Sequence, residues 1–159
     1  GIDFSMFWQG VAKRDLWLDG PMFWGISGGE WQSTGLKEHL DYYRPENTTS
    51  VFGPNTNAYF PKMYMSKDMN QKVQTRYLQN GAYARLKNIQ LGYTFPTQII
   101  NKLHMQKLRV YVSAENVLTI TSLPSGFDPE TTYSSYSDGN SGKTYPLQTT
   151  ISFGLNATF

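Results

Sequence analysis

The sequence predicts an all-β protein: four transmembrane antiparallel strands of a larger β-barrel, joined by long polar loops. Three observations lead to this fold class. Long segments alternate apolar and polar residues, charged residues make up only 16% of the chain, and no apolar stretch approaches the roughly 20 residues of a membrane helix. Ordinary soluble domains carry about a quarter charged residues. The aromatic content of 15% also favours β structure with polar loops.

The clearest strand is predicted at residues 147–159. Odd positions there hold apolar residues or threonine, and even positions hold polar residues or glycine. Because successive side chains of a strand point to opposite faces, this pattern gives one apolar face and one polar face. The segment is longer than a typical globular strand of about 5–6 residues. It suits a tilted strand that crosses a bilayer, which needs about 9–11 residues.

Three further segments repeat the alternation, at residues about 2–13, 83–95 and 107–117. The alternation fails at Arg85 and Lys87, which fall on the apolar side of their segment. Either a bulge shifts the register there or the strand rises above the membrane. We prefer the second explanation, because a charge on the lipid face costs least near the interface.

The connections between these strands are unequal in length. Residues 14–80 and 118–146 form long connections, whereas residues 96–106 form a short one. Outer-membrane barrels have short periplasmic turns and long outer loops. We therefore expect two extracellular loops, a periplasmic turn, and a C-terminus on the periplasmic side. Within the first loop, the spacing of apolar residues predicts a helix over about residues 30–43.

Four strands are too few to close a barrel in a membrane. Single-chain barrels have at least eight strands, and an open sheet in lipid would leave unpaired backbone groups at several kcal/mol each. We therefore expect the partners of this chain to include membrane lipid and the rest of its own barrel.

Several segments resemble, in order, the C-terminal part of the SusC/RagA-type TonB-dependent outer-membrane transporters. They are 44–47 (RPEN), 57–62 (NAYFPK), 80–96 (NGAYARLKNIQLGYTFP), 108–121 (LRVYVSAENVLTIT), 126–130 (GFDPE) and 154–159 (GLNATF). The resemblance implies the last four strands of a plugged barrel of about 22 strands. The plug and the N-terminal domains would be absent from residues 1–159.

The same resemblance implies a location and a set of partners. The location is the outer membrane of a Gram-negative bacterium. The partners are a SusD-like surface lipoprotein that acts as a lid, and the TonB complex, which acts through the absent N-terminal region. The implied activity is TonB-dependent uptake of oligosaccharides or peptides.

Aromatic residues of the loops are the candidates for contact with a ligand or with the lid protein. Flat aromatic faces can stack on sugar rings or on peptide side chains, although many such residues only pack a loop on itself. The candidates are Trp17, Trp24, Trp31, Tyr42, Tyr43, Tyr59, Tyr133 and Tyr136.

Polar residues of the strands should face the barrel lumen, where they line a substrate path or contact the plug. We favour plug contact, because the inner wall of a plugged barrel has a larger area than its binding site. These residues are Asn88, Gln90, Arg109, Tyr111 and Glu115. The terminal Phe159 resembles the barrel-assembly signal of this class, or it is simply an aromatic residue of the interfacial girdle.

The sequence offers no catalytic constellation, so we expect no enzyme. Residues 25–29 match the G-x-S-x-G elbow, but that motif needs a preceding strand and nearby histidine and acid partners. Without cysteine and with two isolated histidines, no metal or other cofactor is expected. The net charge of +2 gives no case for nucleic acid. The alternative to a transporter is a soluble all-β carbohydrate-binding module that uses the loop aromatics.

Overall fold

The computed structural model describes residues 1–28, 35–64, 70–132 and 142–159. The chain divides into two compact units. The first, here called the sheet unit, comprises Gly1–Arg14, Ala82–Ser122 and Leu147–Phe159. The second, here called the loop unit, comprises Asp15–Gly81 and Leu123–Pro146.

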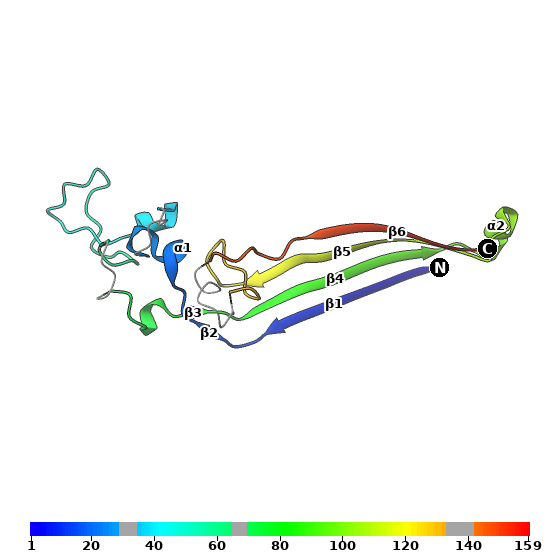
Figure 1. The fold of residues 1–159 in the computed structure, drawn as a ribbon, viewed down its shortest axis with the longest axis horizontal. Coiled ribbons are helices and arrows are strands. Elements are labelled where there is room, and N and C mark those ends of the chain that lie inside the picture. Colours follow the sequence, from blue (N-terminus) through cyan, green and yellow to red (C-terminus); the bar gives the residue numbers. More distant parts are fainter. Residues whose placement is uncertain (29–34, 65–69, 133–141) are drawn as a thin grey trace. The chain divides into compact units, whose positions relative to one another are not determined.

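The sheet unit is an antiparallel sheet of four long strands in the order β1-β4-β5-β6 (Figure 1). The strands are β1 (Ile2–Val11), β4 (Tyr83–Thr94), β5 (Lys107–Thr121) and β6 (Thr150–Thr158). The turn between β4 and β5 contains the short helix α2 (Thr97–Ile100) and a 3₁₀ turn at Asn101–Leu103. This arrangement is the all-β sheet that the alternating segments predict.

The register shows that a bulge causes the irregular alternation in β4, so our preferred explanation was wrong. The pairing of β4 with β1 shifts at Lys87, where it passes from Asn88 to Leu86, and the pairing with β5 shifts at the same place. One inserted residue reverses the faces of the residues beyond it. Arg85 therefore lies on the polar face, where its Nε donates to the Thr119 hydroxyl at 2.7 Å.

The pairing of β5 changes near Asn116, which has a φ of 53°. Its side-chain amide donates to the Gln148 carbonyl at 3.1 Å, and its carbonyl accepts from the Thr149 hydroxyl at 3.0 Å. These side-chain bonds replace regular ladder bonds, so β6 begins at Thr150 rather than at residue 147. Beyond Asn116, β5 stays paired with β4 and continues to Thr121, past the expected end at about residue 117.

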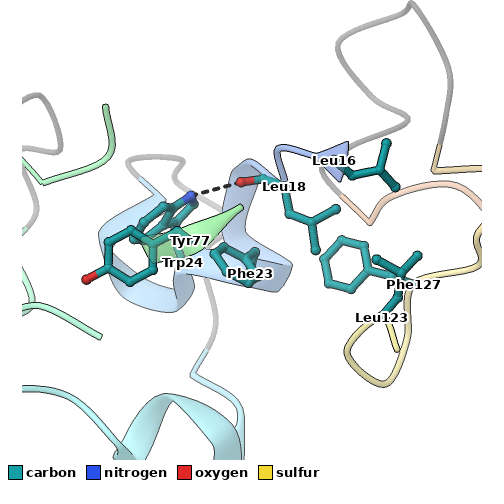
Figure 2. Packing of buried hydrophobic residues seen from close by; sticks show 7 residues of the cluster. All are labelled: Leu16, Leu18, Phe23, Trp24, Tyr77, Leu123 and Phe127. Atoms are coloured by element: carbon teal, nitrogen blue, oxygen red, sulfur yellow. Dashed lines mark hydrogen bonds between the residues drawn. The ribbon is translucent and has the colours of Figure 1, made fainter. Parts of the chain in front are cut away.

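The loop unit is built from both long connections around one apolar core. Its short elements are β2 (Asp15–Leu16), which pairs with β3 (Gln79–Asn80), helix α1 (Gly20–Trp24), and 3₁₀ turns at Gly25–Gly28, Lys37–Leu40 and Thr75–Tyr77. The core contains the buried residues Leu16, Leu18, Phe23, Trp24, Tyr77, Leu123 and Phe127 (Figure 2). Leu123 and Phe127 come from the second connection, so the two connections pack together.

The helix expected over about residues 30–43 does not form in its described part, which begins at residue 35. A single 3₁₀ turn, Lys37–Leu40, occupies that stretch. The His39 ring accepts a bond from the Leu36 N–H at Nδ1, at 2.9 Å, and bonds the Phe23 carbonyl through Nε2 at 3.1 Å. Side-chain bonds of this kind compete with helical backbone bonds.

Among the described residues, no helix combines the length and the apolar character that a membrane crossing requires.

Candidate functional site

One face of the sheet unit is apolar across all four strands. Phe4, Leu91, Val112 and Phe153 stand opposite one another in one row of the register. The two flanking rows on this face are Ile2, Tyr93, Val110 and Leu155, and Met6, Ile89, Ala114 and Ile151. Phe153 is 85% exposed. An apolar surface this broad marks contact with lipid or protein rather than with water.

The opposite face of the sheet is mostly polar. The five residues expected to face a lumen all lie on this face of the register, and they are Asn88, Gln90, Arg109, Tyr111 and Glu115. They belong to the two central strands, β4 and β5. What they contact in a complete barrel stays a prediction.

An ion pair and an aromatic ring join all four strands on the polar face. The Arg109 guanidinium of β5 donates to both carboxylate oxygens of Asp3 in β1, from Nε at 3.0 Å and from an Nη at 2.5 Å. The Arg109 side chain crosses β4 at Gly92. A Cβ atom added at Gly92 would come within 2.6 Å of the Asp3 carboxylate oxygens. The Arg109 Cζ also lies 4.8 Å from the centre of the Tyr111 ring. The Tyr111 ring in turn covers Gly154 of β6, where a Cβ would overlap it.

Sequence reasoning did not assign a role to Asp3, Gly92 or Gly154. The two glycines occupy polar-face positions inside long strands. A strand-interior glycine often marks a place where another group approaches the backbone closely. That signal was available in the sequence, although it does not say which side chain approaches.

The loop-unit aromatics divide into buried and accessible groups. Trp24 is 2% exposed, and its indole N–H donates to the Leu18 carbonyl at 3.2 Å, which leaves no surface of the ring for a ligand or a lid (Figure 2). Trp17 packs on Trp24 with ring centres 5.8 Å apart. Tyr43 is 40% exposed, and Tyr59 is half-buried.

Tyr42 lies against the Arg44 guanidinium, with Cζ 4.6 Å from the ring centre. The other candidates, Trp31, Tyr133 and Tyr136, lie outside the described residues. Phe159 is 78% exposed at the end of β6.

A concave site of about 550 Å³ opens in the loop unit. Phe23, Phe60 and Phe127 form part of its apolar wall, and Glu38, Tyr59 and Gln79 supply polar groups. The Gln79 amide donates to the Tyr59 hydroxyl at 3.0 Å and to the Tyr77 carbonyl at 2.7 Å. The Tyr59 hydroxyl therefore keeps its own proton for a further bond. A few polar groups within an apolar wall are typical of small-ligand sites.

Burial also changes the pKa of the neighbouring Tyr77 side chain. Its side chain is buried in the core, and loss of hydration there raises the pKa of the phenol above its usual value. The nearby Arg76 acts in the opposite direction but with a smaller effect. The phenol is thus held in its neutral form beside the site.

In the described part of the 25–29 motif, Gly25–Gly28, the chain does not form a nucleophile elbow. Ser27 lies in a 3₁₀ turn directly after α1 rather than after a strand. Its hydroxyl accepts a bond from the Tyr64 N–H at 3.2 Å. Both nitrogens of His39 are engaged with backbone groups. Within this described part of the chain, no group of three or more His, Asp or Glu residues is placed to hold a metal ion.

Curated proteins similar to this chain are TonB-dependent receptors, whereas no family model matches it. TonB-dependent receptor P3 of Formosa agariphila is 35% identical over 112 residues, which cover 66% of this chain and 11% of that protein. TonB-dependent receptor P26 of the same organism is 25% identical over 164 residues, covering 99% of this chain and 16% of that protein. The chain thus spans less than a fifth of the length of these relatives.

Solved structures with a similar fold are those of RagAB. The RagAB peptide importer in its open-open state matches all of this chain over 16% of its own, with a TM-score of 0.67 and 23% identity. The closed-closed state matches with a TM-score of 0.65 and 21% identity. These matches and the two-faced sheet identify the chain as a segment of a TonB-dependent outer-membrane receptor with the SusC/RagA-type barrel fold.

Proposed function

We propose that this chain supplies part of the wall and of the outer loops of an importer that takes up oligosaccharides or peptides in a TonB-dependent manner. The importer would act together with a SusD-like surface lipoprotein. The observation that carries the proposal is the four-stranded sheet with one exposed apolar face and one polar face. A soluble carbohydrate-binding module would not leave Phe4, Leu91 and Phe153 exposed to water.

In this proposal the sheet unit lies in the outer membrane, with its apolar face toward lipid. The loop unit lies outside the cell, and α2 and Phe159 lie on the periplasmic side. The topology supports this orientation: both long connections leave the sheet at the end where Val11, Tyr83 and Thr121 are paired, and the short turn lies at the other end. Coupling to the TonB complex would act through parts of the receptor outside this chain.

The loop-unit cavity is the proposed ligand contact. Its aromatic wall suits stacking on a sugar ring or on a peptide side chain. The Tyr59 hydroxyl and the Glu38 carboxylate provide a donor and an acceptor beside that wall. A structural neighbour, RagAB, is a peptide importer, which supports peptides as one of the two substrate classes.

Uptake by living cells tests the proposal. A strain that lacks the full-length receptor would be supplied with the wild-type gene, and uptake of labelled oligosaccharide and peptide pools would be measured with and without an uncoupler of the membrane potential. We expect receptor-dependent uptake of one pool, abolished by the uncoupler. Uptake of neither pool, or uptake that the uncoupler leaves unchanged, would contradict the proposal.

A matched pair of variants tests the cavity. Tyr59→Phe removes a hydroxyl from the cavity, whereas Tyr64→Phe removes one from a residue that does not line it and is 51% exposed. We expect the first variant to lower the apparent affinity of uptake by about 3–10-fold, the usual cost of one hydrogen bond, and the second to leave it unchanged. Equal effects of the two variants would exclude this cavity as the ligand contact.

A further inference from the structure

His39 is a buried imidazole whose two hydrogen bonds fix its protonation state. The side chain is 3% exposed. Its Nδ1 lies 2.9 Å from the Leu36 backbone nitrogen, which can only donate, and its Nε2 lies 3.1 Å from the Phe23 carbonyl oxygen, which can only accept. Nδ1 is therefore the unprotonated acceptor and Nε2 is the donor. The folded loop unit thus requires the neutral imidazole with its proton on Nε2.

These two bonds fasten the 3₁₀ turn Lys37–Leu40 to helix α1. Phe23 belongs to α1, and Leu36 directly precedes the turn. The Phe60 ring packs edge-on against the imidazole, with ring centres 5.5 Å apart. A Cβ atom added at Gly25 would come within 2.7 Å of Nδ1, so the imidazole also lies close against the backbone there. Backbone and apolar groups therefore surround the ring.

The surroundings of the ring supply no counter-charge for an imidazolium. The titratable side chains that line a cavity together with His39 are Lys37, Glu38, Asp41, Tyr42 and Tyr59. Within the described ranges, none of them forms a hydrogen bond or an ion pair with the ring. The Asp41 carboxylate instead accepts from the Asn55 amide at 2.8 Å and from the Tyr59 N–H at 3.1 Å. Residues 20–28 and 124–127 contain no titratable side chain.

Protonation of the ring would break one of the two bonds. A proton on Nδ1 removes the acceptor of the Leu36 N–H and sets two donors against each other. An unpaired buried charge and an orphaned buried donor both destabilise a fold. The end of the turn is held separately, because the Leu40 carbonyl accepts from Arg44 Nη1 at 2.7 Å. The beginning of the turn is therefore the part that protonation releases.

This part of the chain also belongs to the wall of the loop-unit cavity. Leu36 and His39 line both that cavity, of about 550 Å³, and a second hollow of about 590 Å³. We propose that His39 is a pH-sensitive clasp for the wall that these two hollows share. The neutral ring holds Leu36 in place, and protonation of the ring releases it. The clasp follows from bonds inside the loop unit, whereas its effect on ligand uptake rests on the proposed function.

Hydrogen exchange of residues 35–43 in the detergent-solubilised full-length receptor tests the clasp. Protection would be measured at about pH 7.5 and about pH 5.5, on either side of the ordinary histidine pKa of about 6.5, and corrected for the intrinsic pH dependence of exchange. His39→Gln keeps one acceptor and one donor but cannot titrate in this range. The matched control is His104→Gln, the same change at the exposed histidine between β4 and β5.

We expect protection of residues 36–39 to fall by about tenfold at the lower pH, since only the open form takes up the proton. The wild type and His104→Gln should both show this loss, and His39→Gln should not. Unchanged protection in the wild type would overturn the clasp. An equal loss in His39→Gln would overturn it too, because another group would then be the one that titrates.

Two further variants decide the matter if His39→Gln loosens the turn at both pH values. Glu38→Gln and Asp41→Asn remove the two carboxylates that line the cavity. A loss of protection that persists in both supports His39 as the titrating group, and a loss that disappears in either overturns the clasp. The exchange measurement needs no ligand. The clasp can therefore fail while uptake proceeds, and a failure of uptake leaves the exchange result standing.

Discussion

Gly154 provides a quantitative test of how the polar face is packed. The Tyr111 ring lies directly over this glycine, and a Cβ at residue 154 would overlap the outer atoms of the ring. The glycine has no positive φ that would itself exclude alanine. Gly154→Ala therefore changes the available space and little else, and the ring has to rotate away.

The expected cost follows from the contacts that this rotation disturbs. Insertion of a methyl group into an occupied space costs about 1–3 kcal/mol. Displacement of the ring also weakens its contact with the Arg109 guanidinium, 4.8 Å away, which is worth about 0.5–1 kcal/mol at an exposed site. Against this, alanine restricts the unfolded chain and contributes about 0.4–1 kcal/mol of stability. We predict a net destabilisation of about 1–3 kcal/mol.

The assay is urea unfolding of the full-length receptor in detergent. Gly35→Ala is the control, because a Cβ at Gly35 meets no atom within 4 Å. A double-mutant cycle with Tyr111→Ala isolates the contact. Once the ring is removed, Gly154→Ala should leave the free energy of unfolding unchanged or should raise it slightly. Strictly additive effects of the two changes would refute the proposed packing of the ring on the glycine.

Three further predictions concern the loop unit. Arg44→Ala removes the donor to the Gly53 and Leu40 carbonyls, so we expect a loss of about 2–3 kcal/mol in local stability, seen as faster hydrogen exchange over residues 40–60. His39→Ala removes two bonds to the backbone and should open residues 35–43 to proteolysis. The raised pKa of Tyr77 means that its neutral form stabilises the native state fully below the ordinary tyrosine value of about 10. This contribution should decline as pH rises through the raised pKa, and Tyr77→Phe should abolish that alkaline loss.

Each of these predictions has a contradicting outcome. Unchanged exchange in Arg44→Ala would show that the guanidinium does not brace the turn. Wild-type protease resistance in His39→Ala would show that its two bonds are dispensable for the segment. An alkaline transition that persists in Tyr77→Phe would assign it to another group.

The alternation of residues predicted the sheet because a two-faced strand leaves a period of two in the sequence. It could not distinguish a bulge at Lys87 from a strand end above the membrane, since both produce the same misplaced charges. Only the pairing with β1 and β5 decides between them. Likewise, the ion pair of Asp3 with Arg109 joins strands that are far apart in the chain, so no local sequence pattern predicts it.

The loop unit was less predictable than the sheet. The sequence alone does not distinguish a tryptophan that contacts a ligand from a tryptophan that is buried in a loop core. Trp24 is buried because the rings of Phe23, Phe60 and Tyr77 pack against it. The helix expected over about residues 30–43 is absent from its described part, residues 35–43. The periodicity of Leu36 and Leu40 carried no information on the bonds of His39, which form there instead. Contacts between residues far apart within the first connection set both outcomes.

The most direct test of the central claim is a single-cysteine scan of β6 from residues 151 to 155 in the full-length receptor, reconstituted in bilayers that contain brominated lipid. Residues 1–159 contain no cysteine, so within this chain only the introduced thiol can carry the fluorescent label. Lipid contact predicts strong quenching at Ile151, Phe153 and Leu155 and weak quenching at Ser152 and Gly154. Equal quenching along the strand, or none at Phe153, would contradict a membrane-spanning sheet with its apolar face in lipid.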